Sequence, residues 1–309
     1  MRNNMKKIIS TAGKSFSLLL IAVLAITEAK AQLNPLSAIY FQNQYLANPA
    51  MAGVEEGLLI DLAYRQQWSS MPGAPVTQSI TTTYNGGKRV GLGISAFNEE
   101  AGLLKRTRVM GTYAYHLPLN GEGSKLSFGI SLGFMDQRIM NENIDGNPND
   151  NSLGNYRRDT YIDGDFGAAF TSKGLNVQMA LPNLKYVVKQ DEQVNGAVDR
   201  ATFFSSVSYK FTLSEGEDGV GLEPKVCFRE VQNFKNLLDI GTNLTLANNK
   251  VNVLGMYHSS RSATIGMGVN CSPALHINGL YTSQASEIRS FINGNFEINL
   301  KLNVSKLRL

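Results

Sequence analysis

The chain is poor in long hydrophobic runs, in charged residues and in cysteine. After residue 31 it has no continuous apolar run of about 18 residues, which excludes a membrane protein built of helices. Charged residues make up 17% of the chain, against about a quarter in ordinary soluble domains. The net charge of +4 is small and lies partly in the first residues, so no nucleic-acid partner is expected.

The residues that usually carry enzyme chemistry are few and scattered. The three histidines, His116, His258 and His276, fall in different segments, and no two of them have the spacing of metal ligands. No Cys-x-x-Cys motif occurs in the sequence. The G-x-S-x-G letters at Gly129–Gly133 lie inside an alternating strand pattern and not at a strand-to-helix turn, so no nucleophile elbow is expected. Gly91-Leu92-Gly93 resembles the start of a dinucleotide motif but lies inside a strand pattern, without a following helix. The sequence therefore predicts no catalytic residues, no metal site and no cofactor, and it disfavours an enzyme.

Residues 1–31 have the three parts of a secretory signal peptide. Basic residues come first, an apolar run over residues 16–26 follows, and Ala29-Lys30-Ala31 forms a cleavage site before Gln32. The apolar run is too short to cross a bilayer as a helix. We therefore expect residues 1–31 to be removed, residues 32–57 to form an irregular segment, and residues 58–309 to form the folded domain.

The most regular stretch of the folded domain is residues 125–139. Leu126, Phe128 and Ile130 fall on one parity, whereas Ser127 and Gly129 fall on the other. Because successive side chains of a strand point to opposite faces, one face is bulky and apolar and the other is small and polar. In a single stretch this pattern is equally typical of a half-buried strand in a soluble protein. Its recurrence behind a signal peptide predicts a transmembrane antiparallel β-barrel of about 14 strands in the bacterial outer membrane.

Most of the alternating segments have about the length that a tilted strand needs to cross a bilayer. They cover residues 58–64, 76–84, 90–96, 109–117, 125–139, 162–170, 175–181, 203–211, 220–228, 238–246, 251–257, 263–271, 275–281 and 292–300. The two longest gaps follow the fifth and seventh segments, so both fall on the same end of a barrel. Short periplasmic turns opposite long external loops are the known asymmetry of outer-membrane barrels.

Charged side chains fall on the parity opposite to the apolar one, which is the lumen-facing parity of a barrel. They are Asp61, Arg65, Asp163, Asp165, Lys210, Glu223, Lys225, Arg229, Asp239, Arg289 and Glu297. Because both signs occur, ion pairs could crosslink the lumen in place of an open pore. Cys227 shares this parity while Cys271 has the outer one, so a disulfide between them is not expected.

The segment before the first strand, residues 32–57, has no regular period. It contains two Asn-Pro turns, which break regular structure. Two roles stay open for it: a contact surface for a periplasmic partner, or a plug inside the barrel.

Several motifs in order resemble the PorP/SprF family of outer-membrane proteins of the type IX secretion system. They are Phe41-Gln42-Asn43-Gln44-Tyr45, Asn48-Pro49-Ala50-Met51-Ala52-Gly53, Tyr64-Arg65-Gln66-Gln67-Trp68, Pro72-Gly73-Ala74-Pro75, Ala114-Tyr115-His116-Leu117-Pro118-Leu119 and Leu181-Pro182-Asn183-Leu184. The resemblance covers nearly the whole chain after residue 31, and the order of the motifs is its most specific feature. It implies a non-enzymatic component of protein secretion or gliding motility.

The resemblance also implies partners and a set of family-motif residues. The implied partners are outer-membrane lipids together with periplasmic secretion-system lipoproteins and a peptidoglycan-binding subunit, or else a large secreted adhesin. The residues expected at a partner contact or a plug are Gln44, Asn48, Pro49, Gly53, Arg65, Trp68, Pro72 and Gly73. The alternative function is an outer-membrane diffusion channel or a transporter of hydrophobic solutes.

Overall fold

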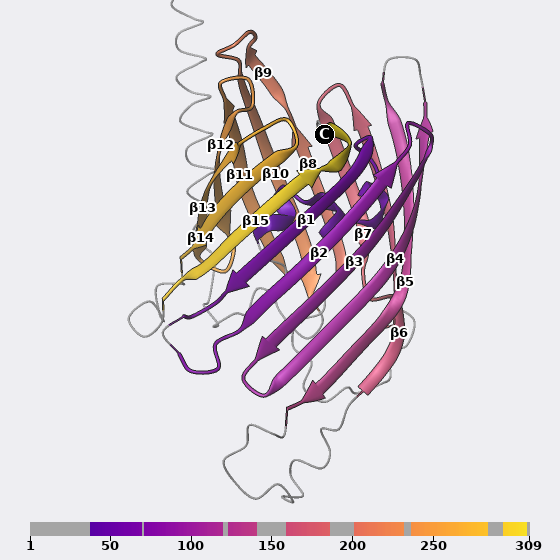
Figure 1. Cartoon of the computed structure of the whole chain (residues 1–309), viewed down its shortest axis with the longest axis vertical. Coiled ribbons are helices and arrows are strands. Elements are labelled where there is room, and N and C mark those ends of the chain that lie inside the picture. Colours follow the sequence, from indigo (N-terminus) through magenta and orange to yellow (C-terminus); the bar gives the residue numbers. More distant parts are fainter. Residues whose placement is uncertain are drawn as a thin grey trace, which may run out of the picture. The chain divides into compact units, whose positions relative to one another are not determined.

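The strands expected from the alternating pattern dominate the computed structural model (Figure 1). The structure describes residues 38–69, 71–119, 123–140, 159–185, 201–231, 236–283 and 293–307. The expected signal peptide, residues 1–31, lies outside these ranges, so its assignment stays a prediction. Within the described ranges, no helix has the length and apolarity needed to cross a membrane.

The strands carry the labels of Figure 1. They are β1 (Gly57–Gln66), β2 (Val76–Asn85), β3 (Val90–Ala101), β4 (Leu104–Pro118), β5 (Lys125–Ile139), β6 (Asp159–Ser172), β7 (Leu175–Leu181), β8 (Ala201–Tyr209), β9 (Phe211–Ser214), β10 (Val220–Val231), β11 (Leu237–Leu246), β12 (Val251–His258), β13 (Ser262–Asn270), β14 (Leu275–Thr282) and β15 (Asn295–Asn303).

These strands form one closed antiparallel barrel. Strands pair with their neighbours along the chain, and β1 pairs with β15 from Leu59 opposite Asn303 to Gln66 opposite Phe296. The strands β8 and β9 both pair with β10 and are one barrel strand interrupted at Lys210. Counted in this way, the barrel has 14 strands, and the predicted fold is confirmed.

The two faces of the wall separate as the parity predicts. On the outer face Ile130, Leu132 and Ile265 expose 55%, 67% and 66% of their surface. On the inner face Ser127 and Ser131 are buried. Exposed apolar side chains around a closed barrel form the band that contacts lipid, while the polar set lines the lumen.

The two ends of the barrel differ. At one end, called here the short-turn end, lie the turns at residues 86–89, 173–174, 247–250 and 271–274, the start of β1 and the 3-10 turn η5 (Val304–Lys306) that follows β15. This end is uppermost in Figure 1. The gaps at 141–158 and 186–200 belong to the opposite, long-loop end, and their residues lie outside the described ranges. From the usual asymmetry of outer-membrane barrels, we expect the short-turn end to face the periplasm.

Some expected boundaries were wrong in detail. The segment 203–211 is not one continuous strand, because Lys210 has no place in either β8 or β9 and the pairing with β10 restarts beyond it. Pro224 of β10, which has no N–H to donate, lies in the gap between the two pairings. The last strand runs to Asn303, past the expected end at residue 300. Cys227 is buried and Cys271 is exposed in the turn that follows β13, and both are free thiols, as expected.

Candidate functional site in the barrel lumen

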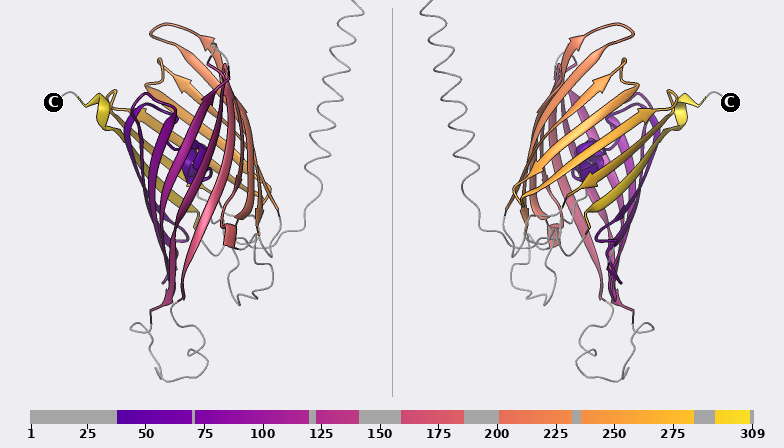
Figure 2. Two further views of the ribbon diagram at one scale, coloured as in Figure 1. Left: turned by 90° about the vertical axis from the view of Figure 1, so that its right-hand side faces the viewer. Right: turned by 90° about the vertical axis from the view of Figure 1, so that its left-hand side faces the viewer.

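Residues 38–53, called here the luminal segment, lie inside the barrel (Figure 2). They form three short 3-10 turns: η1 (Ala38–Phe41), η2 (Gln44–Leu46) and η3 (Pro49–Met51). The third turn follows from its sequence. Pro49 starts it with a preset φ, and the Asn48 side chain accepts a hydrogen bond of 2.9 Å from the Ala50 N–H. Asn48 and Ala50 have no exposed surface at all.

The first turn of the segment is held by the last strand of the barrel. The N–H groups of Ala38 and Ile39 donate to the two carboxylate oxygens of Glu297, at 3.1 and 3.2 Å. The Glu297 carboxylate also pairs with the Arg65 guanidinium of β1 at 3.5 Å. An anionic acceptor suits these N–H groups, because the first turn of a helix leaves them without partners of its own.

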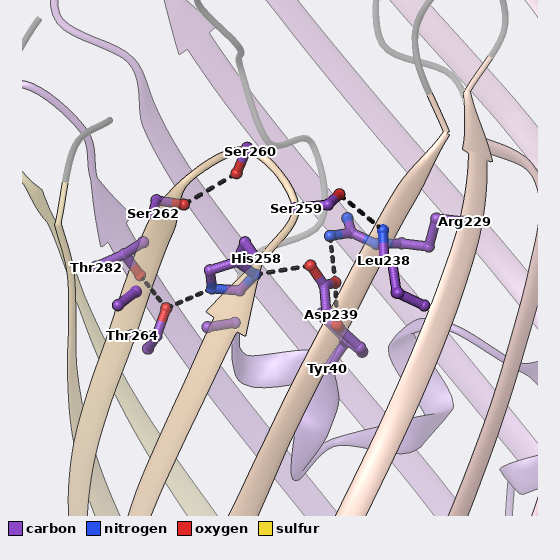
Figure 3. Close-up of polar contacts among 12 residues, drawn as sticks. Tyr40, Arg229, Leu238, Asp239, His258, Ser259, Ser260, Ser262, Thr264 and Thr282 are labelled. Atoms are coloured by element: carbon purple, nitrogen blue, oxygen red, sulfur yellow. Dashed lines mark hydrogen bonds and ion pairs between the residues drawn. The ribbon is translucent and has the colours of Figure 1, made fainter. Parts of the chain in front are cut away.

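A buried polar network at β10–β14 holds Tyr40 of η1 (Figure 3). The Tyr40 hydroxyl and the Arg229 guanidinium both donate to Asp239 Oδ2, at 2.5 and 2.6 Å. The His258 Nδ1 atom lies 2.7 Å from Asp239 Oδ1, and its Nε2 atom lies 2.8 Å from the Thr264 hydroxyl. Burial raises the pKa of the Tyr40 phenol, which keeps it protonated and able to donate to Asp239.

The order of Asp239, His258 and Thr264 is that of a hydrolase triad: carboxylate, imidazole and hydroxyl. Each of the three side chains exposes only 1% of its surface, and the Thr264 hydroxyl also lies 2.7 Å from the Thr282 hydroxyl. An enclosed hydroxyl cannot reach a substrate, so the geometry supports a structural role. No group of three or more His, Cys, Asp or Glu side chains suited to a metal occurs among the described residues.

The middle of the luminal segment contacts the other side of the barrel. The Asn48 amide donates to the Ala168 carbonyl of β6 at 3.1 Å. The Gln44 side-chain oxygen accepts from Asn176 and Gln178 of β7, at 2.8 and 2.6 Å. Further hydrogen bonds join the segment to β2, β4, β10 and β14: Asn43–Thr81, Asn85–Gly53, Tyr45–Thr112, His116–Ala52, Lys225–Phe41 and Asn278–Gln42.

Wall glycines make room for this close packing. A Cβ atom added at Gly129 would overlap the backbone of Pro49 and Ala50. A Cβ atom at Gly167 would overlap the Asn48 side chain. These glycines sit on the lumen-facing parity, where the absence of a side chain lets the segment's backbone approach the sheet.

A cavity large enough for many water molecules remains on the short-turn side of the luminal segment. The larger cavity has a volume of about 820 Å³ and is lined by Gln42 and Gln44 of the segment together with polar wall residues such as Asn252, Asn278 and Lys301. A second cavity of about 230 Å³ lies between the segment and β2 near Thr81 and Thr83. The lumen is therefore filled at the segment and hollow toward the short-turn end.

The expected site residues separate into two groups. Gln44, Asn48, Pro49 and Gly53 lie in the luminal segment, and Arg65 reaches the segment through Glu297. The others belong to the β1–β2 loop at the long-loop end: Trp68, Pro72 and Gly73. There Gly73 adopts a positive φ of 71° and accepts a hydrogen bond of 2.9 Å from the Gly102 N–H, so it shapes the loop and does not join the luminal group.

Several residues that hold the segment were not expected from the sequence as a site. Parity indicated that Lys225, Arg229, Asp239 and Glu297 face inward, but it could not indicate which of them meet. Their partners come from strands distant in the chain, and only the closed register brings them together.

A closed barrel with an apolar exterior and a polar, occupied lumen defines an integral outer-membrane protein. The family model described as "Type IX secretion system membrane protein PorP/SprF" matches residues 29–302, so the chain belongs to the PorP/SprF family. It is therefore a membrane component of the type IX secretion system, located in the outer membrane.

Other comparisons give distant likeness in fold. The chain is similar to the outer membrane protein Omp33 of Acinetobacter baumannii, with a TM-score of 0.49 and 10% identity over 81% of this chain and 99% of the other. It is also similar to the CymD monoaromatic hydrocarbon channel, with a TM-score of 0.47 and 13% identity over 87% of this chain and 92% of the other. No curated protein matches the sequence.

Proposed function

We propose that this protein is a closed barrel platform of the type IX secretion and gliding machinery, and not a diffusion channel. In this role the barrel binds other proteins at its ends: periplasmic lipoproteins and a peptidoglycan-binding subunit, or a large secreted adhesin. The observation that carries the proposal is the way the luminal segment is anchored. It hydrogen-bonds to β2, β4, β6, β7, β10, β11, β14 and β15, on all sides of the lumen.

The anchoring favours a permanent seal over a gate. The contacts include a buried carboxylate shared by Tyr40, Arg229 and His258, and a second carboxylate shared by two backbone N–H groups and Arg65. Removing one partner of a buried ion pair costs about 3–5 kcal/mol. Displacing the whole segment breaks several such contacts together. The free energy that this requires is far larger than ordinary thermal motion supplies.

Two measurements on the purified protein test the platform role. The first is ion conductance in planar bilayers, comparing the full chain with a variant that lacks residues 34–53. We expect no steady conductance from the full chain and open-pore currents from the deletion variant, provided that the variant still shows the gel-mobility shift of a folded barrel on heating.

The second measurement is a mild-detergent pull-down of the tagged full chain from outer membranes, with mass spectrometry. Recovery of periplasmic lipoproteins or of a large surface adhesin supports the platform, and the identity of the partner distinguishes the two roles. A full-length barrel that conducts ions and is recovered alone would overturn the proposal in favour of the channel.

A further inference from the structure

The strands β8 and β9 form one barrel strand that β7 borders on one side, and β9 extends beyond the end of β7. Tyr209, at the end of β8, pairs with Leu175, the first residue of β7. One residue further on, the Lys210 N–H donates to the Gly174 carbonyl at 2.9 Å. Past this point β9 pairs only with β10, and no other strand of the described ranges lies along its second edge. In an ideal closed barrel every strand is paired on both edges. The strand β9 departs from this, because its second edge has no strand partner among the described residues.

This edge belongs to a well-supported hairpin at the short-turn end (Figure 1). The Val220 N–H donates to the Ser214 hydroxyl at 3.1 Å, and the Gly219 N–H donates to the Gly216 carbonyl at 3.1 Å. On the β10 side, the Asn248 N–H of the β11–β12 turn donates to the Gly219 carbonyl at 3.0 Å. The hairpin is therefore braced on one side, which holds its second edge in an extended form.

The residues of β9 do not protect the edge. All four are exposed, with Phe211 at 44% and Leu213 at 60% on the outer face. None of the four is charged or proline, the two usual means by which an exposed edge is blocked. The alternation Phe-Thr-Leu-Ser presents apolar side chains on one face and hydroxyls on the other.

The charges at the two ends of β9 favour one orientation of a strand bound along its edge. The turn beyond β9 carries Glu215, Glu217 and Asp218, all exposed, and no basic residue occurs between Phe211 and Gly219. At the other end of β9 stands the exposed Lys210. A strand laid along this edge is favoured when its basic residues lie beside the turn and its acidic residues lie beside Lys210.

We infer that β9 is a docking site for an extended segment of a periplasmic protein, which adds to its free edge as a further β-strand. The segment has alternating apolar side chains that cover Phe211 and Leu213, and Lys or Arg residues that meet the acidic turn. Main-chain hydrogen bonds provide the affinity in this mode of recognition, and the flanking side chains provide the specificity. The inference rests on the proposed platform function, because a barrel without protein partners has no use for the edge.

Site-specific photocrosslinking in the native outer membrane tests the docking site. A photoreactive benzoyl-phenylalanine replaces Leu213 in one variant and Ile265, which is equally exposed but lies within the lipid band, in another. We expect the Leu213 position to capture a periplasmic protein through a peptide of alternating apolar residues with Lys or Arg beside it. We expect the Ile265 position not to capture that peptide.

Charge reversal supplies the second measurement. The triple change Glu215→Lys, Glu217→Lys and Asp218→Lys reverses the turn, and three exposed ion pairs together are worth about a tenfold change in binding. We therefore expect the yield of the Leu213 adduct to fall about tenfold. Glu56→Lys is the matched control, because Glu56 is exposed at the same end before β1, on the opposite side of the barrel.

The outcomes separate this inference from the platform function. If Leu213 captures only lipid, or a peptide without the basic and alternating pattern, or if the triple variant captures as much as the full chain, the docking site is wrong. In that case the proposed platform function is still supported if the pull-down recovers partner proteins. If the pull-down recovers none and the full chain conducts ions, both proposals fail together.

Discussion

The Tyr40 hydroxyl donates to Asp239 Oδ2 across 2.5 Å, and so joins residues that are 199 positions apart in the chain. The same carboxylate accepts from Arg229 and lies beside His258. One acidic side chain thus fixes the luminal segment to the wall of the barrel and neutralises a fully buried guanidinium.

Removal of the Asp239 charge is expected to cost more than removal of the Tyr40 hydroxyl. In Asp239→Asn, the buried Arg229 loses its counter-charge, and we expect the free energy of unfolding to fall by about 3–5 kcal/mol. In Tyr40→Phe a single hydrogen bond is lost, at about 1 kcal/mol. Urea titration of the two variants in lipid vesicles measures both values. Equal losses of unfolding free energy in the two variants would show that the buried Arg229 charge does not need Asp239 as its counter-charge.

A methyl group at Gly129 is expected to displace the luminal segment while the barrel stays folded. The Cβ atom of Gly129→Ala would overlap the backbone of Pro49 and Ala50, which cannot move without breaking the contacts of η3. We expect open-pore currents in planar bilayers from this variant. Gly279→Ala is the control, because a Cβ atom there meets nothing within 4 Å. A silent Gly129→Ala barrel would mean that the segment adjusts without opening the lumen.

The Asn48 side chain is expected to contribute more than its neighbour Asn43. Asn48→Ala removes the cap on Ala50, worth about 1 kcal/mol, and also the hydrogen bond to Ala168. Together these losses should lower the free energy of unfolding by about 2 kcal/mol. Asn43→Ala removes no cap and loses only its hydrogen bonds to Thr81 and Asp61, so a smaller loss is expected. The ranking is contradicted if the two variants unfold at the same urea concentration.

The two cysteines report the orientation of the barrel. Cys271 is exposed at the short-turn end, whereas Cys227 is buried in the lumen. A membrane-impermeant maleimide should leave intact cells unlabelled and should modify Cys271 once the outer membrane is opened. Cys271→Ser should abolish the labelling, and Cys227→Ser should leave it unchanged. Labelling of intact cells would place the short turns outside the cell.

Much of the fold could be predicted from alternation alone, because a two-residue period assigns every side chain of a strand to one face. Ile130 and Ser131 lie on the faces that the pattern gave them, and so does Cys227. The interruption of the strand at Lys210 could not be predicted. Lys210 is polar and falls on the lumen-facing parity, so the alternation runs through residues 203–211 without a break. The irregularity arises from the pairing with β10, where Pro224 has no N–H to donate.

The candidate site was predictable only in part. The Asn-Pro turn indicated irregular backbone at Asn48, and the parity of Asp239 indicated that its charged side chain faces the lumen. Which inward charges meet depends on barrel closure, because Glu297 approaches Ala38 only when the last strand pairs with the first. Sequence left open whether the segment binds a partner or fills the lumen; the hydrogen bonds of Gln44 and Asn48 are the observations that favour filling.

The bond between the first turn and the last strand also sets an order of assembly. Ala38 and Ile39 are 259 and 258 positions away from Glu297, so the chain emerges with its N-terminal turn long before its acceptor exists. Contacts of such long sequence separation form late, after the loop-closure entropy has been overcome. The Ala38 and Ile39 N–H groups therefore lack this acceptor until β15 is inserted beside β1. This contact therefore forms only in the completed barrel, and a chain truncated before β15 would leave the first turn of the luminal segment without its carboxylate acceptor.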